Sequence, residues 1–146
     1  MAFRFTLAAV LKYRENIERR EYFVLERIQQ EIVYVEGRVR QFQEHFSAVR
    51  KRRDAELAGG LASIHLQTAY EEELRVEKQL DKLQAQLQEL QGKRQQCLKT
   101  YQLARQKREV LDHLRVRQLE AYRRAQAKRQ QSTLDDIFLS RHRSPD

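Results

Sequence analysis

The sequence predicts an all-α protein in which two long helices form an antiparallel coiled-coil hairpin. Three observations support this fold: a heptad stripe of apolar residues over 25–49, a second stripe over 76–101, and the pair Gly59-Gly60 between them. The composition agrees, because 34% of the residues are charged and the chain contains one proline, four glycines and no tryptophan. Such proportions are typical of long helices rather than of a compact core.

The first predicted helix, residues 3–57, carries the more regular stripe. Its apolar positions follow one another in alternating steps of three and four residues, which places them on one narrow side of an α-helix. These positions are Leu25, Ile28, Ile32, Val35, Val39, Phe42, Phe46 and Val49. A stripe of this kind requires a partner helix that covers it.

Toward the N-terminus the same stripe becomes polar. Continued backwards, the heptad falls on Glu21, Glu18, Arg14, Leu11 and Leu7. A second apolar stripe runs beside it, formed by Val10, Ile17 and Val24. Two interpretations are open: a local register shift brings the second stripe into the helix interface, or the second stripe is surplus apolar surface that another molecule contacts.

The second predicted helix, residues 67–131, follows a turn at 58–66 and mirrors the first. Its stripe is densest near the glycines and thins toward the C-terminus at Arg94, Arg108, Arg115 and Gln118. A fold-back at the glycines places Phe42 beside residues 83–87 and Glu18 beside Arg108. It also places the cations of residues 50–53 opposite the acids of residues 71–73, so charges neutralise each other across the hairpin. Residues 132–146 are expected to form a flexible tail.

The net charge of +8 is concentrated at the two ends of the chain. Residues 1–24 hold five basic and three acidic side chains, and residues 103–131 hold nine basic and three acidic ones. Because a hairpin brings these two regions together, we expect an acidic partner or a nucleic acid at that end.

Catalytic, metal and cofactor sites are not expected. The chain has no glycine-rich phosphate loop, and no two of its four histidines are spaced as a metal-binding i, i+4 pair. Cys97 occupies a stripe position among leucines, which indicates core packing, and a single cysteine fits a reducing cytoplasm. No charge-free stretch approaches the ~20 residues of a membrane span, and the first residues lack the apolar run of a signal peptide.

Four motifs, taken in order, resemble one protein family over nearly the whole chain. They are the opening Phe3-Arg4-Phe5-Thr6-Leu7 with the following residues 10–14 and Glu18, the turn Gly60-Leu61-Ala62-Ser63 with Tyr70, the run Lys99-Thr100-Tyr101, and the late Leu134-Asp135-Asp136. This pattern is similar to the FliJ family, soluble components of the flagellar type III export apparatus. In the family this last motif reads Leu or Met, then Asp, then Glu; this chain departs from it by having Asp136 in place of the glutamate.

The resemblance implies a function as well as a fold. It implies a coiled coil similar to the central stalk of rotary ATP synthases, with the end that carries both termini inserted into the pore of the hexameric export ATPase. It also implies contact with the export gate in the inner membrane and escort of export chaperones. The protein would then be cytoplasmic and peripheral to the inner membrane through its partners only, and would bind no nucleic acid or small-molecule substrate.

Candidate contact residues follow from combining this resemblance with the stripes. The ATPase contacts are expected at Leu7, Val10, Tyr13, Arg14, Ile17, Arg19, Arg20, Arg115, Arg117, Arg123 and Arg124. The gate or chaperone contacts are expected near the turn at Phe42, His45, Phe46, Val49 and Tyr70. Two other functions are kept as alternatives: a generic cytoplasmic coiled-coil scaffold or adaptor, and a basic nucleic-acid-binding protein.

Overall fold

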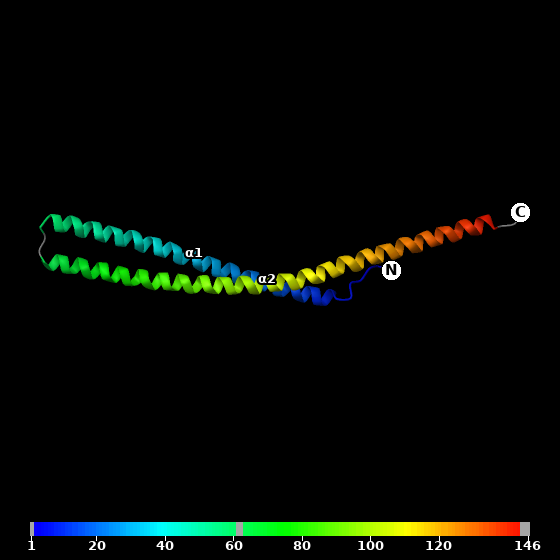
Figure 1. Cartoon of the computed structure of the whole chain (residues 1–146), viewed down its shortest axis with the longest axis horizontal. Helices are drawn as coiled ribbons and strands as arrows, with labels where there is room; N and C mark the ends of the chain where they lie inside the picture. The colour runs from blue at the N-terminus through cyan, green and yellow to red at the C-terminus, as the bar shows by residue number, and fades with distance from the viewer. Residues whose placement is uncertain (1, 61–62, 144–146) are drawn as a thin grey trace. The chain divides into compact units, whose positions relative to one another are not determined.

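The computed structural model describes residues 2–60 and 63–143, and two α-helices account for nearly all of this part. Helix α1 is Ala8–Ala58 and helix α2 is Ser63–His142, with no strand among the described residues (Figure 1). The two helices run in opposite directions and contact each other, so the predicted all-α helical hairpin is confirmed. Among the described residues, neither helix has a stretch apolar enough to cross a membrane.

The helix bounds differ from the predicted ones at both chain ends. Helix α1 begins at Ala8 rather than residue 3, because the preceding segment turns and buries Phe5 while the Ala8 N–H donates to the Phe5 carbonyl at 3.2 Å. Helix α2 continues to His142, through residues assigned above to a flexible tail. Thr133 does not end it, because its hydroxyl donates to the Arg129 carbonyl at 2.8 Å and so stays satisfied inside the helix.

The reversal lies at the tandem glycines. The Gly59 N–H donates to the Ala55 carbonyl at 3.1 Å, and Gly60 has a positive φ of 74°. Glycine adopts this left-handed conformation without the steric cost that a side chain would add, and it ends α1 as a helix cap. The turn is shorter than the predicted 58–66, because Ala58 still belongs to α1 and residues 63–66 already belong to α2. Residues 61–62 lie outside the described residues.

The chain divides into two compact units, which we describe separately. The turn unit is Glu21–Tyr101 and contains the reversal; the terminal unit combines Met1–Arg20 with Gln102–Asp146. The expectation that the whole chain forms a single coiled-coil domain stays a prediction.

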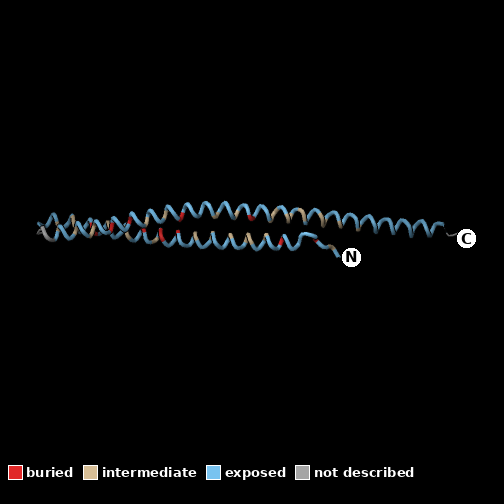
Figure 2. Tube along the Cα trace, turned by 90° about the horizontal axis from the view of Figure 1, so that it is seen from below, coloured by how far each residue is buried: buried red, intermediate tan, exposed pale blue. Residues whose placement is uncertain are grey.

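The core of the turn unit is the predicted pair of heptad stripes. Its buried members are Ile32, Val35, Val39, Val76, Leu80 and Leu90, and the partly buried side chains against them are Ile28, Phe42, Phe46, Leu83 and Leu87. Figure 2 shows buried positions, in red, on both helices. Stripe residues of α1 thus pack on stripe residues of α2, as the mirrored pattern predicted.

The terminal unit has a smaller core. Its buried apolar side chains are Phe5, Leu11 and Ala104, and the Phe3 and Tyr122 rings lie 5.6 Å apart. Beyond Gln126, every described residue of α2 is exposed. The ring contact with Tyr122 comes from Phe3, ahead of α1. The last part of α2 is therefore an exposed helix.

Candidate functional site

A charged layer crosses the interface of the terminal unit where the heptad stripe becomes polar. The Arg108 guanidinium donates to both carboxylate oxygens of Glu18, at 2.5 and 3.2 Å, and to Asp112 at 2.5 Å. These hydrogen bonds, that to Glu18 foremost, raise the pKa of Arg108 above its ordinary value. The side chains keep only 24% (Arg108), 17% (Glu18) and 26% (Asp112) of their exposure, so the layer is partly desolvated.

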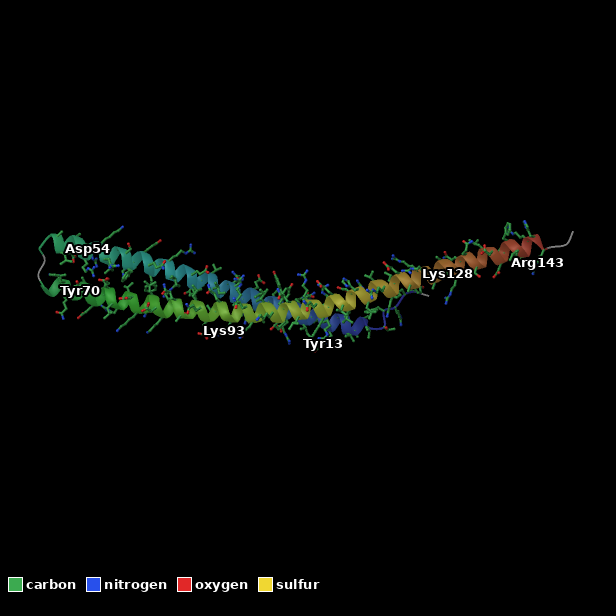
Figure 3. All side chains as sticks on the ribbon, viewed as in Figure 1. Tyr13, Asp54, Tyr70, Lys93, Lys128 and Arg143 are labelled. Atoms are coloured by element: carbon green, nitrogen blue, oxygen red, sulfur yellow. The ribbon has the colours of Figure 1, made fainter. Side chains whose placement is uncertain are left out.

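This layer decides between the two interpretations of the N-terminal stripes. Leu11 is buried and Glu18 is paired across the interface, so the heptad register continues without a shift. Two members of the second stripe stay at the surface, because Val10 and Val24 are 42% and 41% exposed, while Ile17 between them is half-buried. Tyr13 is also at the surface, 61% exposed (Figure 3). The main feature of this end of α1 is exposed apolar surface beside the charged layer formed by Glu18, Arg108 and Asp112.

All eleven predicted ATPase-contact residues lie in the terminal unit. Arg14 and Ile17 are half-buried and the other nine are exposed. Arg115 and Arg124 pair within α2 with Asp112 and Glu120, at 4.0 and 3.7 Å. The unit also holds the net charge of the protein: sixteen basic against eight acidic residues, compared with thirteen of each in the turn unit. The prediction of a basic, partly apolar end thus matches the composition of this unit.

Near the reversal, the cations at the end of α1 pair with the acids at the start of α2. Arg52 donates to Glu72 at 3.3 Å, Arg50 lies 3.4 Å from Glu73, and Arg53 pairs with Glu73. The predicted neutralisation across the hairpin is confirmed. Arg53 also lies 5.0 Å from the centre of the Tyr70 ring, so this exposed tyrosine is held by a cation–π contact.

The five predicted gate or chaperone residues divide into two groups. Phe42 and His45 line an open groove, whereas Val49 is buried at 3% exposure and Phe46 packs against the core. Tyr70 is exposed but lies at the reversal with Arg53 rather than in this groove. A partner on this side of the turn unit would therefore meet Phe42 and His45 first.

The groove, of about 350 Å³, runs between the helices of the turn unit and has a basic rim. Its other lining residues are Arg75, Val76, Lys78, Gln79 and Lys82, and Arg38 lines the adjoining hollow beside Phe42. The Arg38 guanidinium lies 5.5 Å from the centre of the Phe42 ring. We call this site the turn-unit groove. It can accept an apolar side chain on Phe42 and an acidic flank on the rim.

Sequence reasoning missed the basic residues that surround Phe42 and His45 in the turn-unit groove. Arg75 and Lys82 on α2 are seven residues apart, as are Arg38 and His45 on α1, and this spacing places each pair on one side of its helix. That spacing was available in the sequence, but only the helix pairing shows that the two sides meet. No group of three metal-ligating side chains occurs among the described residues.

A family model described as "Flagellar FliJ protein" matches residues 3–145. No curated protein matches the chain in sequence, and no solved structure matches it either. The matched residues include both helices and the reversal between them.

Proposed function

We propose a function from the premise that the chain belongs to the family of flagellar FliJ proteins, which are components of the flagellar export apparatus. The protein acts there as a non-enzymatic central stalk. Its terminal unit binds the hexameric export ATPase and promotes assembly of the ring, and its turn unit couples the ring to the membrane export gate and escorts export chaperones. It reaches the cytoplasmic face of the inner membrane through these partners only.

One observation carries the ATPase contact: the terminal unit combines the entire net charge of +8 with apolar side chains that the hairpin leaves uncovered. The fixed register supports it, since the Glu18–Arg108 pair keeps Val10 and Tyr13 at the surface. Basic charge speeds the encounter with an acidic surface, and apolar side chains that become buried on binding lower the dissociation rate.

The test measures ATP turnover and ring formation by the cognate export ATPase, with and without the full-length protein. We expect stimulation of turnover and co-sedimentation with the ring at moderate salt. Replacing Val10 and Tyr13 by serine should abolish most of the stimulation, while Val33→Ser, at a 55% exposed valine of the turn unit, should not. Absence of both stimulation and co-sedimentation with the unmodified protein would refute the stalk function.

The turn-unit groove supports the gate and chaperone contact. It offers the Phe42 ring between basic rims, a combination that suits a partner with an apolar anchor and acidic flanks. Phe42→Ala should weaken binding of the gate protein or of chaperones without changing the stimulation of the ATPase. Tyr34→Ala, at a 65% exposed aromatic outside the groove, is the matched control. Equal loss in the two variants would contradict the groove as the contact.

A further inference from the structure

We propose that one side of the terminal unit is a docking face for an acidic amphipathic helix, which lies against α1 and α2 as the third helix of a bundle. The docking face consists of Val10, Arg14 and Ile17 on α1 and of Lys107, Val110, Leu114 and Arg117 on α2. The identity of the partner rests on the proposed function, because the export ATPase would supply this helix. The chemistry of the face does not depend on that identity.

The two helices present the same pattern of positions around an inward-facing leucine. On α1, Val10 precedes buried Leu11 by one residue, and Ile17 follows it by six. On α2, Val110 precedes half-buried Leu111 by one residue, and Leu114 follows that leucine by three. At about 100° per residue these apolar side chains are displaced from their leucine in the same rotational sense, by roughly 60–120°.

When side chains on two antiparallel helices are displaced from the interface by the same angle in the same rotational sense, they lie on the same side of the helix pair. The turn-unit groove shows this directly, because Phe42 follows buried Val39 by three residues, Gln79 follows buried Val76 by three, and both line one groove. The Glu18–Arg108 pair sets the level along the terminal unit, so Ile17 lies beside Val110. Each helix therefore contributes apolar side chains to one continuous face.

The exposure of these side chains shows that the face has room for a partner. Val10 is 42% and Val110 is 66% exposed, whereas Ile17 and Leu114 are half-buried. Half-buried residues flanked by exposed ones form a shallow apolar surface between two helices, which a third helix can cover by ridges-into-grooves packing. A nucleic-acid backbone would leave valine and leucine without apolar contact, so the apolar centre favours a protein helix.

The charges of the docking face define the flanks of its partner. Arg14, Lys107 and Arg117 form no ion pair with any described residue; the Arg14 guanidinium only lies 5.8 Å from the centre of the Tyr13 ring. Four acids of this region are paired elsewhere: Glu18 and Asp112 with Arg108, Glu109 with Arg105, and Glu120 with Arg124. Glu15 follows Leu11 by four residues and is therefore displaced from it in the opposite rotational sense, away from the docking face. Three unpaired cations around an apolar centre complement a helix with glutamates beside its apolar stripe.

The test uses a labelled 21-residue peptide designed as an amphipathic helix, with Leu and Ile at its a and d positions and Glu on the flanks. Binding to the full-length protein is measured by fluorescence anisotropy. We expect Val110→Gln and Arg117→Glu each to weaken binding at least about tenfold. The matched controls are Val116→Gln, a 47% exposed valine displaced to the other side of α2, and Lys12→Glu on the opposite side of α1. These controls should change affinity less than about twofold.

Each other outcome overturns the inference. Equal loss in Val110→Gln and Val116→Gln would show that the contact is not confined to this face. Equal loss in Arg117→Glu and Lys12→Glu would show a general effect of net charge. Displacement of the peptide by duplex DNA, with Val110→Gln leaving DNA affinity unchanged, would assign the cations to a nucleic acid. Circular dichroism at 222 nm verifies that each variant keeps its helix content.

The docking face and the proposed function fail in distinguishable ways. If the peptide does not bind while the unmodified protein still co-sediments with the ATPase ring, the docking face is refuted and the stalk function stands. If the peptide binds with the expected variant pattern while the ATPase neither binds nor responds, the stalk function is refuted and the helix belongs to another partner.

Discussion

Removing Arg108 should destabilise the terminal unit more than loss of an ordinary surface ion pair. Arg108→Ala leaves the carboxylates of Glu18 and Asp112 partly buried and without their shared cation. A hydrogen bond to a charged group contributes about 1.5–3 kcal/mol, and breaking a fully buried pair costs about 3–5 kcal/mol. Because the two carboxylates keep 17% and 26% of their exposure, we expect a loss of about 2–3 kcal/mol, between the surface and the buried limits.

A double-mutant cycle separates the pair from its surroundings. Glu18→Ala, Arg108→Ala and the double variant are compared by urea unfolding, followed by circular dichroism and by hydrogen exchange of the amides of residues 11–18. We expect a coupling of about 1–2 kcal/mol between Glu18 and Arg108. A coupling below about 0.5 kcal/mol, the level of an exposed pair, would refute the structural argument.

Replacing both members of the pair by leucine should be close to neutral. Glu18→Leu with Arg108→Leu removes two desolvated charges and extends the heptad stripe, and such exchanges of a buried pair for apolar side chains are often neutral or stabilising. A large loss of stability in this variant would show that the charged layer is required to align the helices, rather than being tolerated within them.

Three further predictions concern positions whose surroundings are simple. Gly37→Ala should stabilise α1 by about 1 kcal/mol, because alanine favours the helix and a Cβ there meets nothing within 4 Å. Gly60→Ala should destabilise the turn, because the φ of Gly60 is positive. Thermal unfolding measures both effects. Leu90→Ala, at 7% exposure in the turn-unit core, should cost about 2–4 kcal/mol, while Val116→Ala, at an exposed site, should cost less than about 0.5 kcal/mol in urea unfolding. Amides of residues 127–142 should exchange fastest among the helical residues, because every residue of that part of α2 is exposed. Slow exchange there in the monomer would contradict this.

Much of the fold was predictable from the spacing of apolar residues. The stripe over 25–49 and its mirror over 76–101 identified the core members, and the glycine pair identified the reversal. The Glu18–Arg108 pair followed from the same fold-back. The C-terminal end of α2 was not predicted: residues 132–146 were expected to form a flexible tail, whereas α2 continues to His142 and the Thr133 hydroxyl bonds within the helix.

The candidate contact surfaces were predictable only in part. Composition and helix spacing identified a basic end and a second apolar stripe, but did not show whether Val10 faces the interface or the solvent. The turn-unit groove was located through Phe42 and His45, yet its basic rim on α2 was missed. A groove is built by two segments distant in sequence, and spacing within one helix does not reveal what the other helix places beside it.

By itself, the sequence determined the helices, their direction and the residues between them, because the heptad spacing and the glycine reversal act locally along the chain. Only the tertiary structure decided which apolar side chains of the terminal unit stay exposed at its surface. Once Glu18 and Arg108 pair across the helices, the register cannot shift, and Val10 and Val110 are left outside on the same side. That outcome depends on the rotation of each helix against its partner, which follows from packing and pairing across the interface rather than from either helix alone.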